Sequence, residues 1–309
     1  MKNKIVTLGL ILLVGYSYAQ QDAQFTQYMY NTISVNPAYA GSKLGTSLFL
    51  LNRSQWVGLD GAPVTTNVSV HAPINRSNVG LGLSIINDKI GPSEESTIAI
   101  DFSYTLKMSD TYKLAFGLKT SGNILNIDFN KLNKYDQNDY SFETNVENRF
   151  SPNVGVGLYL YSDKTYIGLS APNLLETNHF DEYADVGASS FIAQERIHYY
   201  LIAGHVFDVS SNVKFKPTLL VKTVQGAPMQ FDVSGNFLFN EKFTAGIAYR
   251  WDVAVSALVG FQASDSFFIG YGYDLETTRL ATYNSGSHEI FLKYDFFNRF
   301  GKVVSPRFF

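Results

Sequence analysis

The chain contains no cysteine, and only 17% of its 309 residues are charged. The absence of cysteine excludes disulfide bonds, thiolate metal sites and a lipid anchor attached through an N-terminal cysteine. Soluble domains carry about 25% charged residues, so the low charge content indicates a surface that partly faces lipid. The net charge of −3 comes without a basic stripe or cluster, which argues against a nucleic-acid partner.

Long apolar runs are also missing, except near the start of the chain. Two early lysines, an apolar run over 5–15 and the small residues Ser17 and Ala19 follow the order of a secretory signal peptide, which we expect to cover residues 1–19. This run is too short for a transmembrane helix, and no later segment approaches the roughly 18 apolar residues that a spanning helix needs. The sequence therefore predicts an exported protein without a spanning helix.

Apolar and polar residues alternate along much of the remaining chain. In residues 97–107 every even-numbered residue from Ile98 to Leu106 is apolar, and most residues between them are small or polar. The same period of two recurs in 112–119, 213–222 and 229–240. This period is typical of a strand with one apolar face and one wet face. Runs of about ten such residues after a signal peptide are typical of a membrane-spanning β-barrel.

We therefore expect an all-β fold, a transmembrane antiparallel β-barrel of about 14 strands over residues 44–297. Residues 20–43 would form an N-terminal periplasmic or plug segment, and residues 298–309 a periplasmic tail. Short polar connections alternate with mostly longer ones, which predicts short periplasmic turns and long extracellular loops. The expected strands cover 45–53, 64–72, 79–87, 97–107, 112–121, 152–161, 164–171, 196–207, 213–223, 228–239, 242–250, 253–262, 266–274 and 287–297. The expected long loops cover 54–63, 88–96, 122–151, 172–195 and 275–286.

A soluble β-sandwich also alternates apolar and polar residues, but its outer face should be charged. Here the polar faces are lightly charged and rich in glycine, as at Gly80 and Gly82. An open sheet edge in lipid costs several kcal/mol for each unpaired backbone group, so a sheet in a membrane must close. We expect polar side chains, among them the following charged ones, to line the lumen: Asp101, Lys113, Lys119, Lys214, Lys216, Lys222, Asp232, Glu289 and Asp295.

The sequence gives no set of residues for catalysis, metal binding or a cofactor. The nucleophile pattern G-x-S-x-G is absent, because Gly168-Leu169-Ser170 is followed by Ala171 and Pro172. His198 and His205 are seven positions apart on one expected strand, and so lie on opposite faces. No glycine-rich loop precedes a helix, as phosphate binding would require. We expect a protein that is not an enzyme and carries no metal or cofactor.

Several short motifs, in order along the mature chain, carry a resemblance to a known family. The motifs lie at 24–31, 35–41, 55–56, 61–63, 69–73, 80–82, 88–91, 167–170, 226–228, 270–274, 286–290 and 305–309. Among them are Asn36-Pro37-Ala38-Tyr39 and Gly286-Ser287-His288-Glu289. In these motifs the chain resembles the PorP/SprF family of type IX secretion system outer-membrane proteins of Bacteroidota. Family members often have a cysteine before the last proline, where this chain has Ser305.

The resemblance implies a role in protein secretion. Family members help cargo proteins that bear a type IX C-terminal targeting domain to cross the outer membrane or attach to it, and some support gliding motility. The implied partners are such a cargo protein, other secretion-system or peptidoglycan-binding proteins of the periplasm, and outer-membrane lipid. The rival function is an outer-membrane porin or a transporter of hydrophobic solutes, similar to the fatty-acid porins.

Two regions are candidates for binding partners. Residues 20–43 would plug the lumen, bind a periplasmic protein or clamp the first strand. Loops near 122–151 and 172–194 would contact the cargo, by strand addition if it offers an extended segment. The candidate partner-binding residues are Tyr28, Tyr30, Asn36, Pro37, Tyr39, Phe180, Tyr183 and Phe191.

Overall fold

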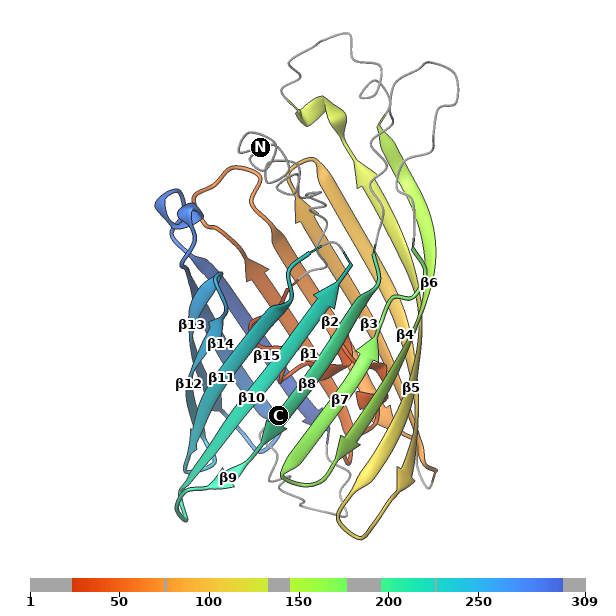
Figure 1. Cartoon of the computed structure of the whole chain (residues 1–309), viewed down its shortest axis with the longest axis vertical. Helices are drawn as coiled ribbons and strands as arrows, with labels where there is room; N and C mark the ends of the chain where they lie inside the picture. Colours follow the sequence, from red (N-terminus) through yellow and green to blue (C-terminus); the bar gives the residue numbers. More distant parts are fainter. Residues whose placement is uncertain (1–23, 75–76, 133–144, 177–195, 226, 297–309) are drawn as a thin grey trace, which may run out of the picture.

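The computed structural model is a closed antiparallel β-barrel with 14 strands in its wall (Figure 1). It describes residues 24–74, 77–132, 145–176, 196–225 and 227–296. The strands are β1 Thr46–Ser54, β2 Val64–Pro73, β3 Val79–Ile90, β4 Ser93–Lys107, β5 Lys113–Ile127, β6 Val146–Tyr161, β7 Thr165–Ala171, β8 His198–His205, β9 Phe207–Asp208, β10 Val213–Val224, β11 Gln230–Phe239, β12 Phe243–Arg250, β13 Ala254–Gln262, β14 Phe267–Glu276 and β15 Ser287–Phe296. The two-residue β9 follows β8 and pairs with the same neighbour, β10, so β8 and β9 count as one strand of the wall.

The ring closes between the first and the last strand. β1 pairs with β15 from Thr46 opposite Phe296 to Ser54 opposite His288. The other strands each pair with the next along the chain, with β8 and β9 both pairing with β10. Closure satisfies the backbone groups of the wall from within the sheet, as lipid requires. The described part of the chain contains no helix with the length and hydropathy needed to cross a membrane.

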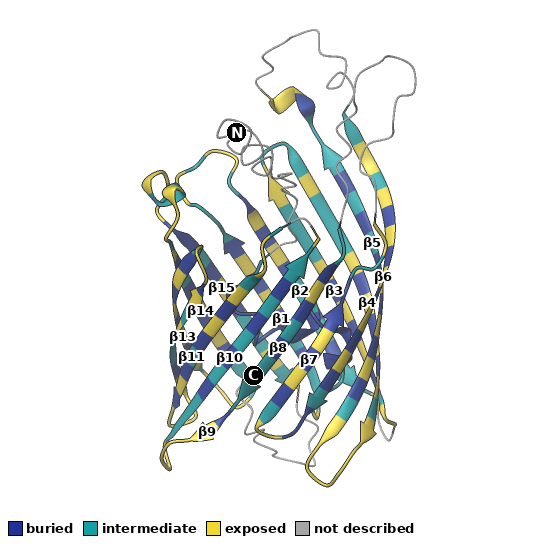
Figure 2. Ribbon diagram, viewed as in Figure 1, coloured by how far each residue is buried: buried dark blue, intermediate teal, exposed yellow. Residues whose placement is uncertain are grey.

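The wall has an apolar outer face and a polar inner face, which confirms the prediction from the period of two. On β4, Ile98, Ile100 and Phe102 are 46%, 54% and 41% exposed, whereas Asp101 and Ser103 are fully buried. The same alternation appears as bands of exposed and buried residues along the strands in Figure 2. Residues exposed on the outside are mainly Ile, Leu, Val and Phe. Such a face is stable in lipid and would not be stable in water.

Most of the predicted lumen charges are buried inside the ring: Asp101, Lys119, Lys216, Lys222, Asp232 and Glu289. Lys113 and Lys214 lie where strands begin, and Lys113 is exposed to water there. Lys214 pairs with Glu241 of the adjacent turn at 3.0 Å. Asp295 is partly buried and pairs with Lys43 and Lys293 at 3.1 and 3.4 Å.

The two ends of the barrel differ. At one end, which we call the short-turn end, strands are joined by connections such as 108–112, 162–164 and 240–242. At the other, the long-loop end, the connections include 55–63, 128–145, 172–197 and 277–286. Figure 1 shows the short-turn end at the bottom and the long-loop end at the top. Short turns face the periplasm in barrels of this type, so the long-loop end faces outward.

Two of the predicted loops are too long. The expected loop over 88–96 is a tight turn, because β3 continues to Ile90 and β4 begins at Ser93. The expected loop over 122–151 shrinks in the same way, since β5 continues to Ile127 and β6 begins at Val146. In the extension of β3 and β4, the outward-facing Asn87 and Ser96 are polar and bond to each other. There the apolar signal ends before the strands do.

Residues 24–42, which we call the arm, lie inside the ring and add no strand to it. The arm consists of a turn over 26–30 and two 3-10 helices, η1 Thr32–Ser34 and η2 Pro37–Tyr39. Almost all of its side chains are buried. The helix η2 lies against β4, β5 and β6. In Figure 1 the arm is the red segment between the strands.

Candidate functional site in the barrel lumen

The arm runs through the lumen from the long-loop end towards the short-turn end. Thr26 contacts Arg53 and Glu289, which lie at the ends of β1 and β15 next to the long loops. Gly41 approaches Gly80 of β3, near the short-turn end. The chain then enters β1 at Thr46. The arm therefore crosses the lumen lengthwise before the chain turns into β1 at the short-turn end.

A buried group of charges holds the upper end of the arm. Arg53 pairs with Asp274 at 2.7 Å and with Glu289 at 3.1 Å, and none of the three side chains is more than 3% exposed. We call these three residues the Arg53 cluster. Arg53 and Glu289 are direct partners across the β1–β15 seam, which explains why they meet. The two carboxylates and one guanidinium leave one negative charge in excess.

The arm supplies hydrogen-bond donors for that excess charge. Glu289 accepts hydrogen bonds from the backbone N–H groups of Thr26, at 3.1 Å, and Gln27, at 3.0 Å. The Thr26 hydroxyl lies 2.7 Å from Asp274 Oδ2 and donates to that carboxylate. Hydrogen bonds to charged groups are stronger than those between neutral groups. The Arg53 cluster thus binds the backbone of the arm as well as one of its side chains.

Aromatic rings fill the middle of the lumen. The Tyr30 ring stacks on Phe268 and packs at a tilt against Phe291, with centroid distances of 5.4 and 4.9 Å. The Lys216 ammonium lies 5.0 Å from the centroid of the Tyr30 ring. Tyr28 shares a hydrogen bond of 2.9 Å with Thr218. Burial raises the pKa of both Tyr28 and Tyr30 above the ordinary phenol value, so both side chains are neutral.

The lower part of the arm packs against three glycines of the wall, Gly80, Gly117 and Gly157, which we call the glycine seat. A Cβ added at Gly117 would lie 2.1 Å from the Ala38 nitrogen, and one at Gly157 would lie 2.2 Å from Asn36 Oδ1. A Cβ at Gly80 would lie 2.2 Å from the Ala40 carbonyl oxygen. Only glycine allows the arm to approach the wall this closely.

Hydrogen bonds between the wall and the backbone of the arm fix the arm on the glycine seat. Ser103 Oγ donates to the Ala40 carbonyl and Ser170 Oγ to the Val35 carbonyl, each at 2.6 Å. Asn36 Nδ2 donates to the Leu158 carbonyl at 2.9 Å. The Asn36 side-chain oxygen accepts from the Ala38 N–H at 3.0 Å and thereby caps η2. One asparagine side chain therefore anchors the arm and shapes it.

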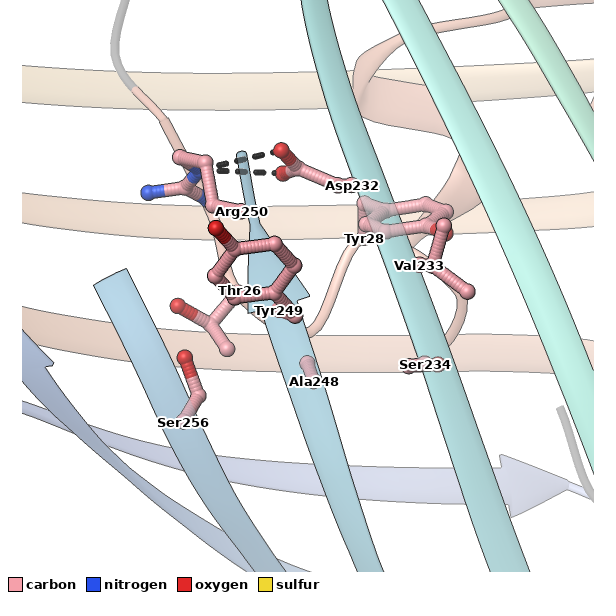
Figure 3. Close-up of a pocket in the computed structure, with 9 residues that line it drawn as sticks. All are labelled: Thr26, Tyr28, Asp232, Val233, Ser234, Ala248, Tyr249, Arg250 and Ser256. Atoms are coloured by element: carbon pink, nitrogen blue, oxygen red, sulfur yellow. Dashed lines mark hydrogen bonds and ion pairs between the residues drawn. The ribbon is translucent and has the colours of Figure 1, made fainter. Parts of the chain in front are cut away.

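Little space remains beside the upper arm. A cavity lined by Thr26, Tyr28, Asp232 and Arg250, among others, has a volume of about 10 Å³, which is room for about one water molecule. Figure 3 shows Arg250 and Asp232 facing each other beside it, joined by an ion pair. The shortest distance in this pair is 3.0 Å. At this level side chains of the arm and the wall fill the lumen.

The structure brings together the five predicted site residues of the N-terminal segment: Tyr28, Tyr30, Asn36, Pro37 and Tyr39. All five are buried in the lumen and contact the wall or the arm itself. Tyr39 packs edge-on against His71 and Tyr159, with centroid distances of 5.2 and 5.5 Å. Phe180, Tyr183 and Phe191 lie outside the described residues. The binding of partners by these eight residues remains a prediction.

Sequence reasoning did not find the Arg53 cluster as a site. Glu289 was predicted to face the lumen, but Arg53 and Asp274 were not singled out. The family motifs contained a signal for this cluster. They include Thr26, Asp274 and Glu289, and Arg53 lies just before the motif over 55–56. The motif over 35–41 likewise meets the motifs over 80–82 and 167–170 at the wall. Several of the motifs that carry the resemblance therefore supply contacts between arm and wall.

Comparison with known proteins agrees with this geometry. Residues 17–294 match the family model of the type IX secretion system membrane protein PorP/SprF. The chain belongs to the PorP/SprF family. As a PorP/SprF protein with a closed barrel, it is located in the outer membrane. No curated protein matches the sequence.

A solved channel shares the fold of this PorP/SprF protein. The monoaromatic hydrocarbon channel CymD has 13% sequence identity and a TM-score of 0.50, with 89% of this chain and 94% of CymD covered. A FadL homologue from Pseudomonas aeruginosa has 12% identity and a TM-score of 0.45, with 93% and 97% covered. The family and the similar folds are secretion components and channels rather than enzymes. In the described ranges no three His, Asp or Glu side chains are grouped as metal ligands.

Proposed function

We propose that this PorP/SprF protein supports the secretion or surface attachment of a cargo protein that bears a type IX C-terminal targeting domain. The match of residues 17–294 to the secretion family carries this proposal. The barrel gives the protein a surface on each side of the outer membrane. The long-loop end receives the cargo outside, and the short-turn end contacts secretion-system or peptidoglycan-binding proteins in the periplasm.

The proposal predicts that cells lacking this protein lose the cargo from their surface. We expect surface cargo, measured by labelling intact cells, to fall at least about tenfold, with recovery when the protein is restored. In these cells, a variant in which a Gly-Ser linker replaces residues 177–195 should assemble as a barrel. It should not restore surface cargo, because the linker removes the predicted cargo contacts. The matched control places the same linker at the 240–242 turn of the short-turn end.

Normal surface cargo in cells that lack the protein would overturn the secretion role. Normal cargo with the 177–195 variant alone would overturn the contact between this loop and the cargo. Loss of cargo with both linkers would mean that the linker harms assembly rather than docking. Heat-modifiable migration of the barrel in gels reports assembly for each variant.

A channel for hydrophobic or other small solutes is the second candidate, supported by the fold shared with CymD. The arm opposes free passage, because it crosses the lumen from the Arg53 cluster to the glycine seat with almost all of its side chains buried. We therefore expect the intact protein in planar lipid bilayers to show no steady conductance. A stable solute-permeable pore in these recordings would favour transport over the secretion role.

A further inference from the structure

The ring of strands is complete without the arm. Each of the strands in the wall pairs with two neighbours, and the seam between β1 and β15 holds nine residue pairs from Thr46–Phe296 to Ser54–His288. The arm consists of turns and two 3-10 helices, and contributes no strand to this sheet. The backbone hydrogen bonds that close the barrel are therefore independent of the arm.

The arm continues into the wall only through residues 43–45. Leu44 in this link is 65% exposed and lies outside the lumen packing. The chain has no cysteine, so no disulfide bond can join the arm to the wall. All other contacts of the described arm are hydrogen bonds, packing contacts and the contact of the Lys216 ammonium with the Tyr30 ring, and all of these form and break reversibly.

The wall recognises the arm as it would recognise a separate peptide. Glu289 accepts from two backbone N–H groups, and Ser103 and Ser170 donate to two backbone carbonyls. Backbone bonding of this kind gives affinity, and shaped spaces for side chains give selectivity. Here the selectivity comes from the glycine seat, where any Cβ at Gly117 would meet the backbone of the arm.

We propose that the lumen is a peptide-binding site and that residues 24–42 are its resident ligand, tethered through residues 43–45 and otherwise held by non-covalent contacts. The site takes a peptide with an Asn-Pro-Ala-Tyr turn at one end and a free pair of backbone N–H groups for Glu289 at the other. Once the link at residues 43–45 is cut, the arm exchanges with a free peptide of the same sequence while the barrel stays closed. This property goes beyond the role in cargo secretion and does not depend on it.

The test uses the full chain with a protease site inserted between Lys43 and Leu44. After the barrel has folded in detergent, cleavage at this site separates the arm from the wall. We expect the cleaved arm to remain with the barrel in gel filtration and to be replaced by an excess of fluorescent peptide corresponding to residues 20–43. Fluorescence anisotropy measures this exchange as saturable binding.

Two matched pairs test whether the peptide occupies the site seen in the structure. In the wall, Gly117→Ala should weaken binding by at least roughly tenfold, because its Cβ would lie 2.1 Å from the Ala38 nitrogen. Gly235→Ala is the control, since its nearest neighbour is the movable Phe215 ring at 3.2 Å. In the peptide, Asn36→Ala should weaken binding, whereas Ser34→Ala should not, because the Ser34 hydroxyl bonds within the arm to the Asn31 carbonyl.

Three results would overturn the proposal. In the first, the barrel unfolds when the link is cut, which would make the arm part of the wall's own structure. In the second, the cleaved arm stays bound but no labelled peptide enters even after long incubation. In the third, peptide binds equally well to the Gly117→Ala and Gly235→Ala barrels. Because the assay uses purified protein and no cargo, its failure is distinct from a failure of the secretion role.

Discussion

Arg53→Met is expected to lower the free energy of unfolding of the barrel by about 3–5 kcal/mol. Arg53 is 2% exposed and is the shared partner of Asp274 and Glu289. Its removal leaves two buried carboxylates without the guanidinium, and such unpaired buried charges are strongly destabilising. Urea unfolding in detergent micelles, followed by the fluorescence of the two tryptophans, measures this change.

The control for this prediction is an exposed ion pair on the same barrel. Lys107 pairs with Asp110 at 2.7 Å, but the two side chains are 67% and 99% exposed. Exposed pairs of this kind contribute at most about 1 kcal/mol, so Lys107→Met should change stability very little. Equal losses for Arg53→Met and Lys107→Met would contradict the role of the Arg53 cluster. Partial recovery on adding Asp274→Asn and Glu289→Gln to Arg53→Met would support it.

The second large effect is expected from a charge on the outer face. Phe102 lies at the middle of the apolar stripe that runs from Ile98 to Leu106 on β4. Phe102→Arg should destabilise the barrel in lipid by about 2–4 kcal/mol, because the charge lies near the middle of the bilayer. Urea unfolding in lipid vesicles measures the loss of stability.

Glu94→Arg provides the comparison on the same strand and the same face. Glu94 lies beyond the apolar stripe, where it accepts a hydrogen bond of 3.1 Å from Asn87 in an exposed position. An arginine at this level is in contact with water, so the loss should be within about 1 kcal/mol. If both arginines cost the same, the outer face of β4 does not lie in lipid.

Most of the wall was predictable from the sequence, because a period of two directly reports which residues share a face. The predicted strands over 213–223 and 253–262 differ from β10 and β13 by one residue at an end. The ends of β4 and β5 were not predictable in this way. On β4 the residues before Ile98 are polar on both faces, from Ser93 to Thr97, and at the end of β5 the adjacent Ile124 and Leu125 interrupt the alternation. A strand with two polar faces carries no alternating signal.

The lumen site was harder to predict, for two reasons. The arm has no period, because it forms turns and 3-10 helices shaped by the cavity around them. The Arg53 cluster depends on the register between the first and last strands, which places Arg53 opposite Glu289. Alternation can show that both side chains face inward, but it cannot show that residues 236 positions apart are partners.

The unequal heights of the strands affect how a large molecule can reach the opening. β4, β5 and β6 have 15, 15 and 16 residues, whereas β12 and β13 have 8 and 9. On the low side, Tyr249 and Trp251 are exposed beside the turn, and exposed aromatic side chains are typical of the level of the lipid head groups. The rim of the barrel is therefore slanted: it is high over β4, β5 and β6 and low over β12 and β13. A large molecule at the outer surface therefore has a lower edge to cross over β12 and β13 than over β4, β5 and β6.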